Sequence, residues 1–190
     1  MAKRAFFRYF IFLSRNALKQ SQTTLTLSNL KAVADGLSQV QCNFYSEACA
    51  VAFEKNNHIS ETKLTVDGVY KGSFQVVWEK ATSLTGWQDN DVVAENAAIA
   101  IACFLVTEVT EYTIVRQSIK GTGFDYWLGY KTEHPKFDPN NFLLARLEIS
   151  GIFHGTSTDL NSRVQKKLKQ VDRSAKMKLP AFIAVTEFGN

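Results

Sequence analysis

The spacing of hydrophobic residues predicts a buried helix, three strands, a second helix and a last strand in the C-terminal half of the chain. Residues 89–111 are apolar on all sides in the middle of the segment, which is typical of a buried helix. Residues 157–171 carry their apolar side chains on one helical stripe. Short strand-like runs occupy the remaining segments, 112–118, 124–129, 143–152 and 181–185. This order predicts an α/β fold, a mixed sheet with helices on its faces.

The beginning of the chain has weaker signals. An aromatic-rich strand is expected over residues 5–13, followed by a polar loop over residues 14–26. Ser28 is expected to cap a helix over residues 29–55, with a weak point at Asp35-Gly36. An apolar stripe supports this helix: Leu30, Ala34, Leu37, Val40, Phe44, Ala48, Val51 and Ala52.

A β-hairpin completes the N-terminal part, because residues 63–66 and 73–78 flank turn-forming residues, with the turn at Asp67-Gly68 or centred nearer Lys71-Gly72. We expect the boundary of the C-terminal part in the polar segment before the buried helix. The chain is thus divided into residues 1–85, an N-terminal α+β region that could serve as a docking surface, and residues 86–190, an α/β core.

Composition indicates a folded, cytoplasmic protein. Hydrophobic residues make up 45% of the 190 residues, enough for a substantial core, and the net charge is only +4. Cys42, Cys49 and Cys103 form no disulfide framework or zinc-site spacing. The longest apolar run, residues 97–106, is about half the ~20 residues that a membrane span needs. Arg8 interrupts the apolar N-terminal run, which speaks against a signal peptide.

Two carboxylates stand among apolar neighbours in the predicted strands. Strand alternation places Glu148 on the same face as Arg146, opposite the leucines and isoleucines, and Asp125 lies at the preceding strand. Burying a lone carboxylate is costly unless it is paired or bound to a metal. Asp125 and Glu148 could therefore share a divalent cation, or they could be structural partners of Arg116 and Arg146.

Further candidates lie before and beside these strands. The loop over residues 118–123 contains two glycines, which permit either a simple turn or the close approach of the backbone to a ligand. Lys120 in this loop would bring positive charge near the carboxylates. Glu95 lies near the start of the buried helix, where an acidic side chain either stabilises the helix dipole or serves a site.

Positive charge gathers near the end of the chain, where the basic residues are Arg163, Lys166, Lys167, Lys169, Arg173, Lys176 and Lys178. Such a run is ordinarily a solvated helix face. It could equally follow a phosphate backbone. Arg163, Lys166, Lys167 and Arg173 lie off the apolar stripe of the predicted helix and are the candidate nucleic-acid contacts.

The residues of this region resemble the active site of the PD-(D/E)XK nucleases, the restriction-endonuclease-like and Holliday-junction-resolvase-like superfamily. The resemblance rests on Glu95 in a helix, a glycine-containing loop before Asp125, and Glu148 in the strand Leu147-Glu148-Ile149-Ser150. The order of helix, three strands, helix and strand is similar to that superfamily's core. The resemblance covers residues 89–188.

The resemblance implies hydrolysis of phosphodiester bonds in DNA or RNA with Mg²⁺ or Mn²⁺. Asp125 and Glu148 would be metal ligands together with the carbonyl of Ile149, and Glu95 would be a further acid near the metal. The ion would activate a water molecule and stabilise the charge on the phosphate. The family likeness also suggests a homodimer or a larger assembly, such as an effector of antiviral defence in bacteria. No membrane partner is expected, because no apolar run is long enough to span a bilayer.

Ser150 departs from the family pattern, which places a lysine at this position. A serine hydroxyl cannot supply a positive charge, so Lys120, Lys166 or Lys167 would have to replace the missing lysine. The alternative is a nuclease fold without nuclease activity that binds nucleic acid or a partner protein.

Overall fold

The computed structural model describes residues 5–12, 24–68, 70–81 and 83–189. These residues form one mixed sheet of eight strands in the order β2-β4-β3-β1-β8-β7-β6-β5. The strands are β1 (Ala5–Phe12), β2 (Thr24–Thr26), β3 (Thr62–Val66), β4 (Gly72–Val77), β5 (Thr113–Gln117), β6 (Tyr126–Gly129), β7 (Ala145–Ile152) and β8 (Ala181–Glu187).

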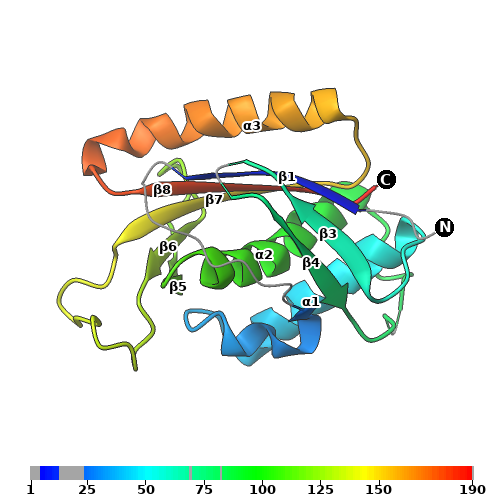
Figure 1. Ribbon diagram of the computed structural model, residues 1–190, viewed down its shortest axis with the longest axis horizontal. Helices are drawn as coiled ribbons and strands as arrows, with labels where there is room; N and C mark the ends of the chain where they lie inside the picture. Colours follow the sequence, from blue (N-terminus) through cyan, green and yellow to red (C-terminus); the bar gives the residue numbers. More distant parts are fainter. Residues whose placement is uncertain (1–4, 13–23, 69, 82, 190) are drawn as a thin grey trace.

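Helices cover both faces of the sheet. α3 (Ser157–Val171) lies on one side, and α1 (Gln39–Lys55) and α2 (Asn90–Val109) lie on the other (Figure 1). Two short 3-10 helices, η1 (Leu27–Ala32) and η2 (Asp172–Met177), precede α1 and follow α3. The predicted α/β class, a mixed sheet with flanking helices, is confirmed.

The C-terminal elements follow the predicted order, and their pairing explains how α3 is placed. β6 runs antiparallel to both of its neighbours, β5 and β7, whereas β7 and β8 are parallel. Parallel neighbours need a crossover connection, and α3 supplies it. Because α3 crosses over β7 and β8, every second side chain of β7 points at this helix.

α2 is the central core helix. The Asp89 carboxylate caps it by accepting hydrogen bonds from the backbone amides of Asp91 and Val92 at 2.9 and 3.2 Å. By length and composition α2 could cross a membrane, but most of its apolar window is buried against α1 and the sheet. Its all-round apolar sequence therefore reflects the core of the fold.

The helix predicted over residues 29–55 is wrong in its first third. The structure has η1, a turn and then α1, and the cap is Ser38 in a capping box with Gln41 rather than Ser28. The turn is held at Gly36, whose backbone N–H donates to the Ile114 carbonyl of β5 at 2.7 Å. A side chain at Gly36 would meet the β5 backbone at 2.4 Å, so the strand blocks a continuous helix.

Two residues of the predicted apolar stripe are not buried, because the helix begins later than predicted. Val40 is 77% exposed and Phe44 is 44% exposed. Because α1 begins only at Gln39, residues 30–37 do not set its helical phase, and the buried face is the one that carries Cys42, Cys49 and Phe53.

The other N-terminal predictions fare better. The expected strand over residues 5–13 is present as β1, and the hairpin is present as the antiparallel pair β3 and β4. The predicted loop over residues 14–26 falls mostly outside the described residues, and Thr24–Thr26 is a strand that pairs in parallel with β4 instead.

The predicted segments 1–85 and 86–190 share one sheet and one core. β1 pairs with β8 in antiparallel fashion and with β3 in parallel, so it joins the strands of the two segments. α1 packs directly on α2, and buried residues of both segments belong to the same hydrophobic cluster. The N-terminal segment thus supports the sheet that carries the candidate site.

Candidate active site

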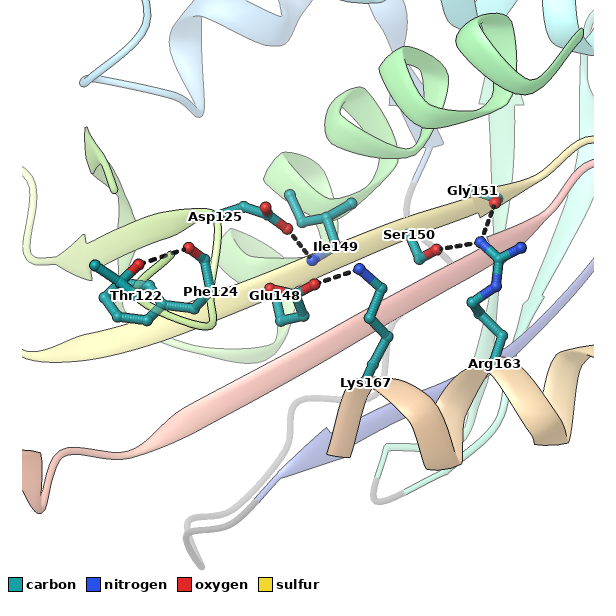
Figure 2. Close-up of polar contacts among 9 residues, drawn as sticks. All are labelled: Thr122, Phe124, Asp125, Glu148, Ile149, Ser150, Gly151, Arg163 and Lys167. Carbon is teal, nitrogen blue, oxygen red and sulfur yellow. Dashed lines mark hydrogen bonds and ion pairs between the residues drawn. The ribbon is translucent and has the colours of Figure 1, made fainter. Parts of the chain in front are cut away.

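The sheet opens where β6 begins, and this opening creates the site. Asp125 lies just before β6 and still bonds to β7, because its backbone N–H donates to the Leu147 carbonyl at 2.9 Å. Its Oδ2 accepts from the Ile149 N–H at 2.7 Å (Figure 2). Before Asp125 the chain turns away from β7 at Gly123, which has a φ of +91°. The β7 edge beyond Leu147 is therefore left without a neighbouring strand.

A cleft of about 750 Å³ occupies the opening. It is lined by α2, by the loop before β6, by β7 and by the α3–η2 face, and one residue, Tyr45, comes from α1. Of the site and nucleic-acid-binding residues predicted from the sequence, Glu148 and Lys166 do not line this cleft, and the others do: Glu95, Lys120, Asp125, Ile149, Ser150, Arg163, Lys167 and Arg173. The structure thus brings together residues from five separate segments.

Two glycines allow the walls of the cleft to approach one another. A Cβ atom on Gly151 would lie 1.9 Å from the carbonyl oxygen of Ala94, so only glycine lets α2 pack directly on β7 and place Glu95 beside the strand. A Cβ atom on Gly123 would lie 2.6 Å from the carbonyl oxygen of Gln170 at the end of α3. The glycine loop therefore serves close packing in addition to its turn.

Glu148 lies beneath the cleft, on the α3 side of β7. It is fully buried, its Oε1 accepts a hydrogen bond from the Lys167 ammonium group, and its Oε2 has no hydrogen-bond donor among the described residues (Figure 2). The predicted alternation of faces along β7 is correct, since Arg146, Glu148 and Ser150 all contact α3 or η2.

The environment of Glu148 raises its pKa to about 7. Burial is the main cause, because it disfavours the charged form, and the negative charge of Asp125 adds to it. Lys167 acts in the opposite direction. Asp125 reaches the same stretch of β7, because its Oδ2 accepts from the backbone amide of Ile149, the residue next to Glu148.

Ser150 does not stand alone at the position where the resembling family has lysine. Its Oγ accepts a hydrogen bond from Arg163 Nη1 at 2.8 Å, and the same nitrogen donates to the Gly151 carbonyl at 3.2 Å (Figure 2). Ser150 is buried, whereas Arg163 is partly exposed to the cleft. The two α3 cations Arg163 and Lys167 thus reach adjacent parts of β7.

Lys167 is the cation closest to the carboxylates. Its side chain is 18% exposed and meets Glu148 directly. Lys120 is exposed in the loop and lines the cleft, but no ion pair joins it to a described carboxylate. Lys166 points to a second cleft, so of the three lysines considered as replacements only Lys167 meets a carboxylate of the site.

Glu95 is an exposed residue of the cleft wall. α2 begins at Asn90, and Asp91 is the acidic residue of its first turn, so Glu95 lies beyond the turn where the helix dipole acts. The position of Glu95 is therefore better explained by the cleft than by stabilisation of the helix start.

The alternative ion pairs with arginines are not seen among the described residues. Arg146 donates to Ser174 Oγ at 2.6 Å and to the Leu179 carbonyl at 2.7 Å, which fixes η2 against β7. Arg116 lies over the ring of Phe142 at 4.9 Å. Neither arginine pairs with Asp125 or Glu148 in the described contacts.

The oxygen atoms at this edge of the sheet are hard donors of the kind that divalent cations prefer. In the described part of the chain, no group of three or more His, Cys, Asp or Glu side chains is placed to hold a metal. Asp125 and Glu148 offer carboxylate oxygens, and the unpartnered Oε2 of Glu148 is a buried atom that needs a cation or a proton. The Ile149 carbonyl points to the same open edge as that of Leu147, because alternate carbonyls of a strand share an edge. Two carboxylates, a carbonyl and water molecules suit Mg²⁺ or Mn²⁺.

Sequence reasoning missed two contributors. Gly151 gave no local signal, since its role depends on contact with α2. Tyr45 belongs to the N-terminal region, and its hydroxyl lies 3.3 Å from that of Tyr126 in β6. No motif could link Tyr45 to the cleft, because only the packing of α1 on α2 brings it there.

The chain was compared with known proteins at three levels. No family model, no curated protein and no solved structure matches it.

Proposed function

We propose that the protein is a metal-dependent nuclease of the PD-(D/E)XK type, which hydrolyses phosphodiester bonds of DNA or RNA. The observation that carries the proposal is the position of the Asp125 carboxylate at the open edge of β7, where it accepts from the amide of Ile149, the residue next to the buried Glu148. The order of α2, β5–β7, α3 and β8 supports the likeness to a restriction-endonuclease-like core. A cleft with cations on its walls suits a polyanionic substrate.

Asp125 and Glu148 would hold the ion, with Glu148 bound through Oε2 and the Ile149 carbonyl as a third ligand. When bound, Mg²⁺ or Mn²⁺ would supply an activated water molecule and neutralise charge on the phosphate. Asp125 is oriented for this role because the Ile149 amide fixes its other oxygen at 2.7 Å. Glu95, on the opposite wall, is placed to contact the water shell of the site.

Lys167 takes the part of the missing strand lysine. Its ammonium group comes from α3 instead of β7, yet it reaches the same carboxylate cluster. There it lowers the pKa of Glu148 and keeps a positive charge next to the position of the reacting phosphate. Lys120 and Arg173 extend this positive charge along the cleft.

The second candidate function is binding of nucleic acid, or of a partner protein, without cleavage. It is favoured by Ser150, and by the fact that Glu148 is fully buried and already paired with a lysine. If this function is the right one, Asp125 and Glu148 stabilise the fold and bind no metal.

The two functions separate in a cleavage assay on labelled single- and double-stranded DNA and RNA with Mg²⁺ or Mn²⁺. We expect cleavage by the wild type and loss of at least about a hundredfold in Asp125→Asn and Glu148→Gln. Asp172→Asn is the matched control, because Asp172 is an exposed carboxylate outside the cleft lining. Binding without cleavage of any of these substrates, by a folded wild-type protein, would support the second candidate instead.

The proposal extends to the assembly. A nuclease of this size needs a means of choosing its target, so we propose that the chain acts as a homodimer or within a larger complex, such as a bacterial defence effector. Size-exclusion chromatography with light scattering, with and without nucleic acid, tests the assembly, and a monomer under both conditions would contradict it.

A further inference from the structure

We infer that Arg163 is a preoriented phosphate clamp, held in place by Ser150, that binds a phosphodiester next to the one cleaved in a polynucleotide substrate. This inference rests on the proposed function and adds to it a specific contact and a role for Ser150. Its basis is the geometry of Arg163, which differs from that of every other basic residue in the cleft.

Only one nitrogen of the Arg163 guanidinium group, Nη1, is hydrogen-bonded to described residues. Nη1 donates one hydrogen bond to Ser150 Oγ at 2.8 Å and one to the Gly151 carbonyl at 3.2 Å, so both of its hydrogens are used (Figure 2). Nε and Nη2 make no hydrogen bond to any described residue. These two nitrogens lie on the same edge of the planar guanidinium group, where their N–H bonds are parallel.

A parallel pair of N–H donors is the arrangement that binds two oxygens of one phosphate. The β7 anchor fixes the plane of the group in advance, which reduces the conformational entropy lost on binding. Lys167 cannot play this part, because its ammonium group is engaged by Glu148. Lys120 and Arg173 have no comparable anchor on the sheet among the described contacts.

The position of Arg163 points to a polymer. Besides the main cleft, Arg163 lines a second cleft of about 490 Å³ between the starts of α2 and α3, where the other charged residues are Lys166, Asp91 and Asp159. Arg163 is the one residue common to the two lining sets. A phosphate held there would lie where a strand leaves the carboxylates and continues toward Lys166.

Ser150 then has a function at the position where the family likeness predicts lysine. A lysine side chain at this place would compete with Arg163 for the same space on β7. The small hydroxyl instead accepts from Nη1 and sets the direction of the guanidinium edge. Ser150 is therefore a positioning residue, and the cations of the site come from α3.

The test measures binding of fluorescent DNA and RNA oligonucleotides by anisotropy in EDTA, where cleavage cannot occur, at several salt concentrations. Arg163→Lys keeps the charge and removes the fork, so affinity should fall about tenfold with an unchanged salt slope. Arg163→Gln should weaken binding further and reduce the slope of log K against log salt by about one. Lys169→Gln is the control, because Lys169 lies on α3 outside both clefts.

Ser150→Ala keeps every charge but removes the anchor, and we expect the same loss of about tenfold as in Arg163→Lys. The double variant should bind no more weakly than either single variant, because the two changes remove one interaction. A merely structural Ser150 would instead give additive losses or none. Circular dichroism and thermal unfolding of each variant establish that it is folded.

Two outcomes distinguish a failure of the Arg163 clamp from a failure of the proposed nuclease function. If the wild type binds and cleaves but Arg163→Lys and Ser150→Ala bind like the Lys169→Gln control, the clamp is refuted and the nuclease stands. If the folded wild type neither binds nor cleaves any of the oligonucleotides, the proposed function fails, and the clamp fails with it.

Discussion

Glu148 makes the sharpest prediction, because its buried carboxyl group couples the stability of the metal-free protein to pH. The pKa of this group rises from an ordinary value of 4.5 to about 7. The folded state therefore binds more protons than the unfolded state between these two values, so stability falls as the pH rises through this window. Below it both states are protonated, and above it both are ionised.

The magnitude follows from the size of the shift. At about 1.36 kcal/mol per pH unit, the rise in pKa corresponds to about 3 kcal/mol of lost stability across the window. Glu148→Gln removes the titration while keeping the size of the side chain and an oxygen acceptor for Lys167. The free energy of unfolding of the variant minus that of the wild type should thus increase by about 3 kcal/mol from about pH 4.5 to about pH 7.5.

The assay is urea unfolding in EDTA at a series of pH values, followed by tryptophan fluorescence. Taking the difference between the two proteins cancels the contributions of other groups, among them Glu187, whose pKa is also raised by burial. A difference that does not change with pH, or that shrinks as the pH rises, would refute the reasoning about Glu148.

Three further changes test the surroundings of the site. Gly151→Ala should destabilise the fold by about 2 kcal/mol, measured by urea unfolding, because the new Cβ would meet an α2 carbonyl at 1.9 Å; Gly86→Ala, which has open space around it, should change stability by less than about 0.5 kcal/mol. Lys167→Met should reduce cleavage at neutral pH about a hundredfold and shift the pH profile of cleavage upward, because Lys167 lowers the pKa of Glu148. The control Lys169→Met should change neither the rate nor the profile. An unchanged pH profile in Lys167→Met would contradict the role of Lys167. Ser38→Ala should cost about 1 kcal/mol in thermal or urea unfolding through loss of the capping box, and an unchanged stability would show that this cap contributes nothing.

Elements with strong periodicity could be predicted from the sequence. The amphipathic stripe over residues 157–171 gave the bounds of α3, and the buried helix was found to within a few residues at each end. The alternation along β7 correctly placed Glu148 and Ser150 on one face, because the sheet packs against α3 there. Local pattern determines these features almost entirely.

What could not be predicted depends on contacts between distant segments. The break before α1 is imposed at Gly36 by the backbone of β5, and no local pattern shows that contact. The sequence left Lys120, Lys166 and Lys167 as equal replacements for the missing lysine. Only the crossing of α3 over β7 selects Lys167, and the same crossing brings Arg163 to Ser150.

Nuclease activity of the proposed kind requires that Asp125 and Glu148 bind one divalent ion together. A crystal structure of the protein grown with Mn²⁺, with anomalous diffraction recorded for manganese, tests this directly. We predict one anomalous peak within about 2.5 Å of an oxygen of each carboxylate, at the Ile149 carbonyl edge. The map would contradict the account if it had no peak there, or if Glu148 remained paired with Lys167 alone while manganese bound elsewhere.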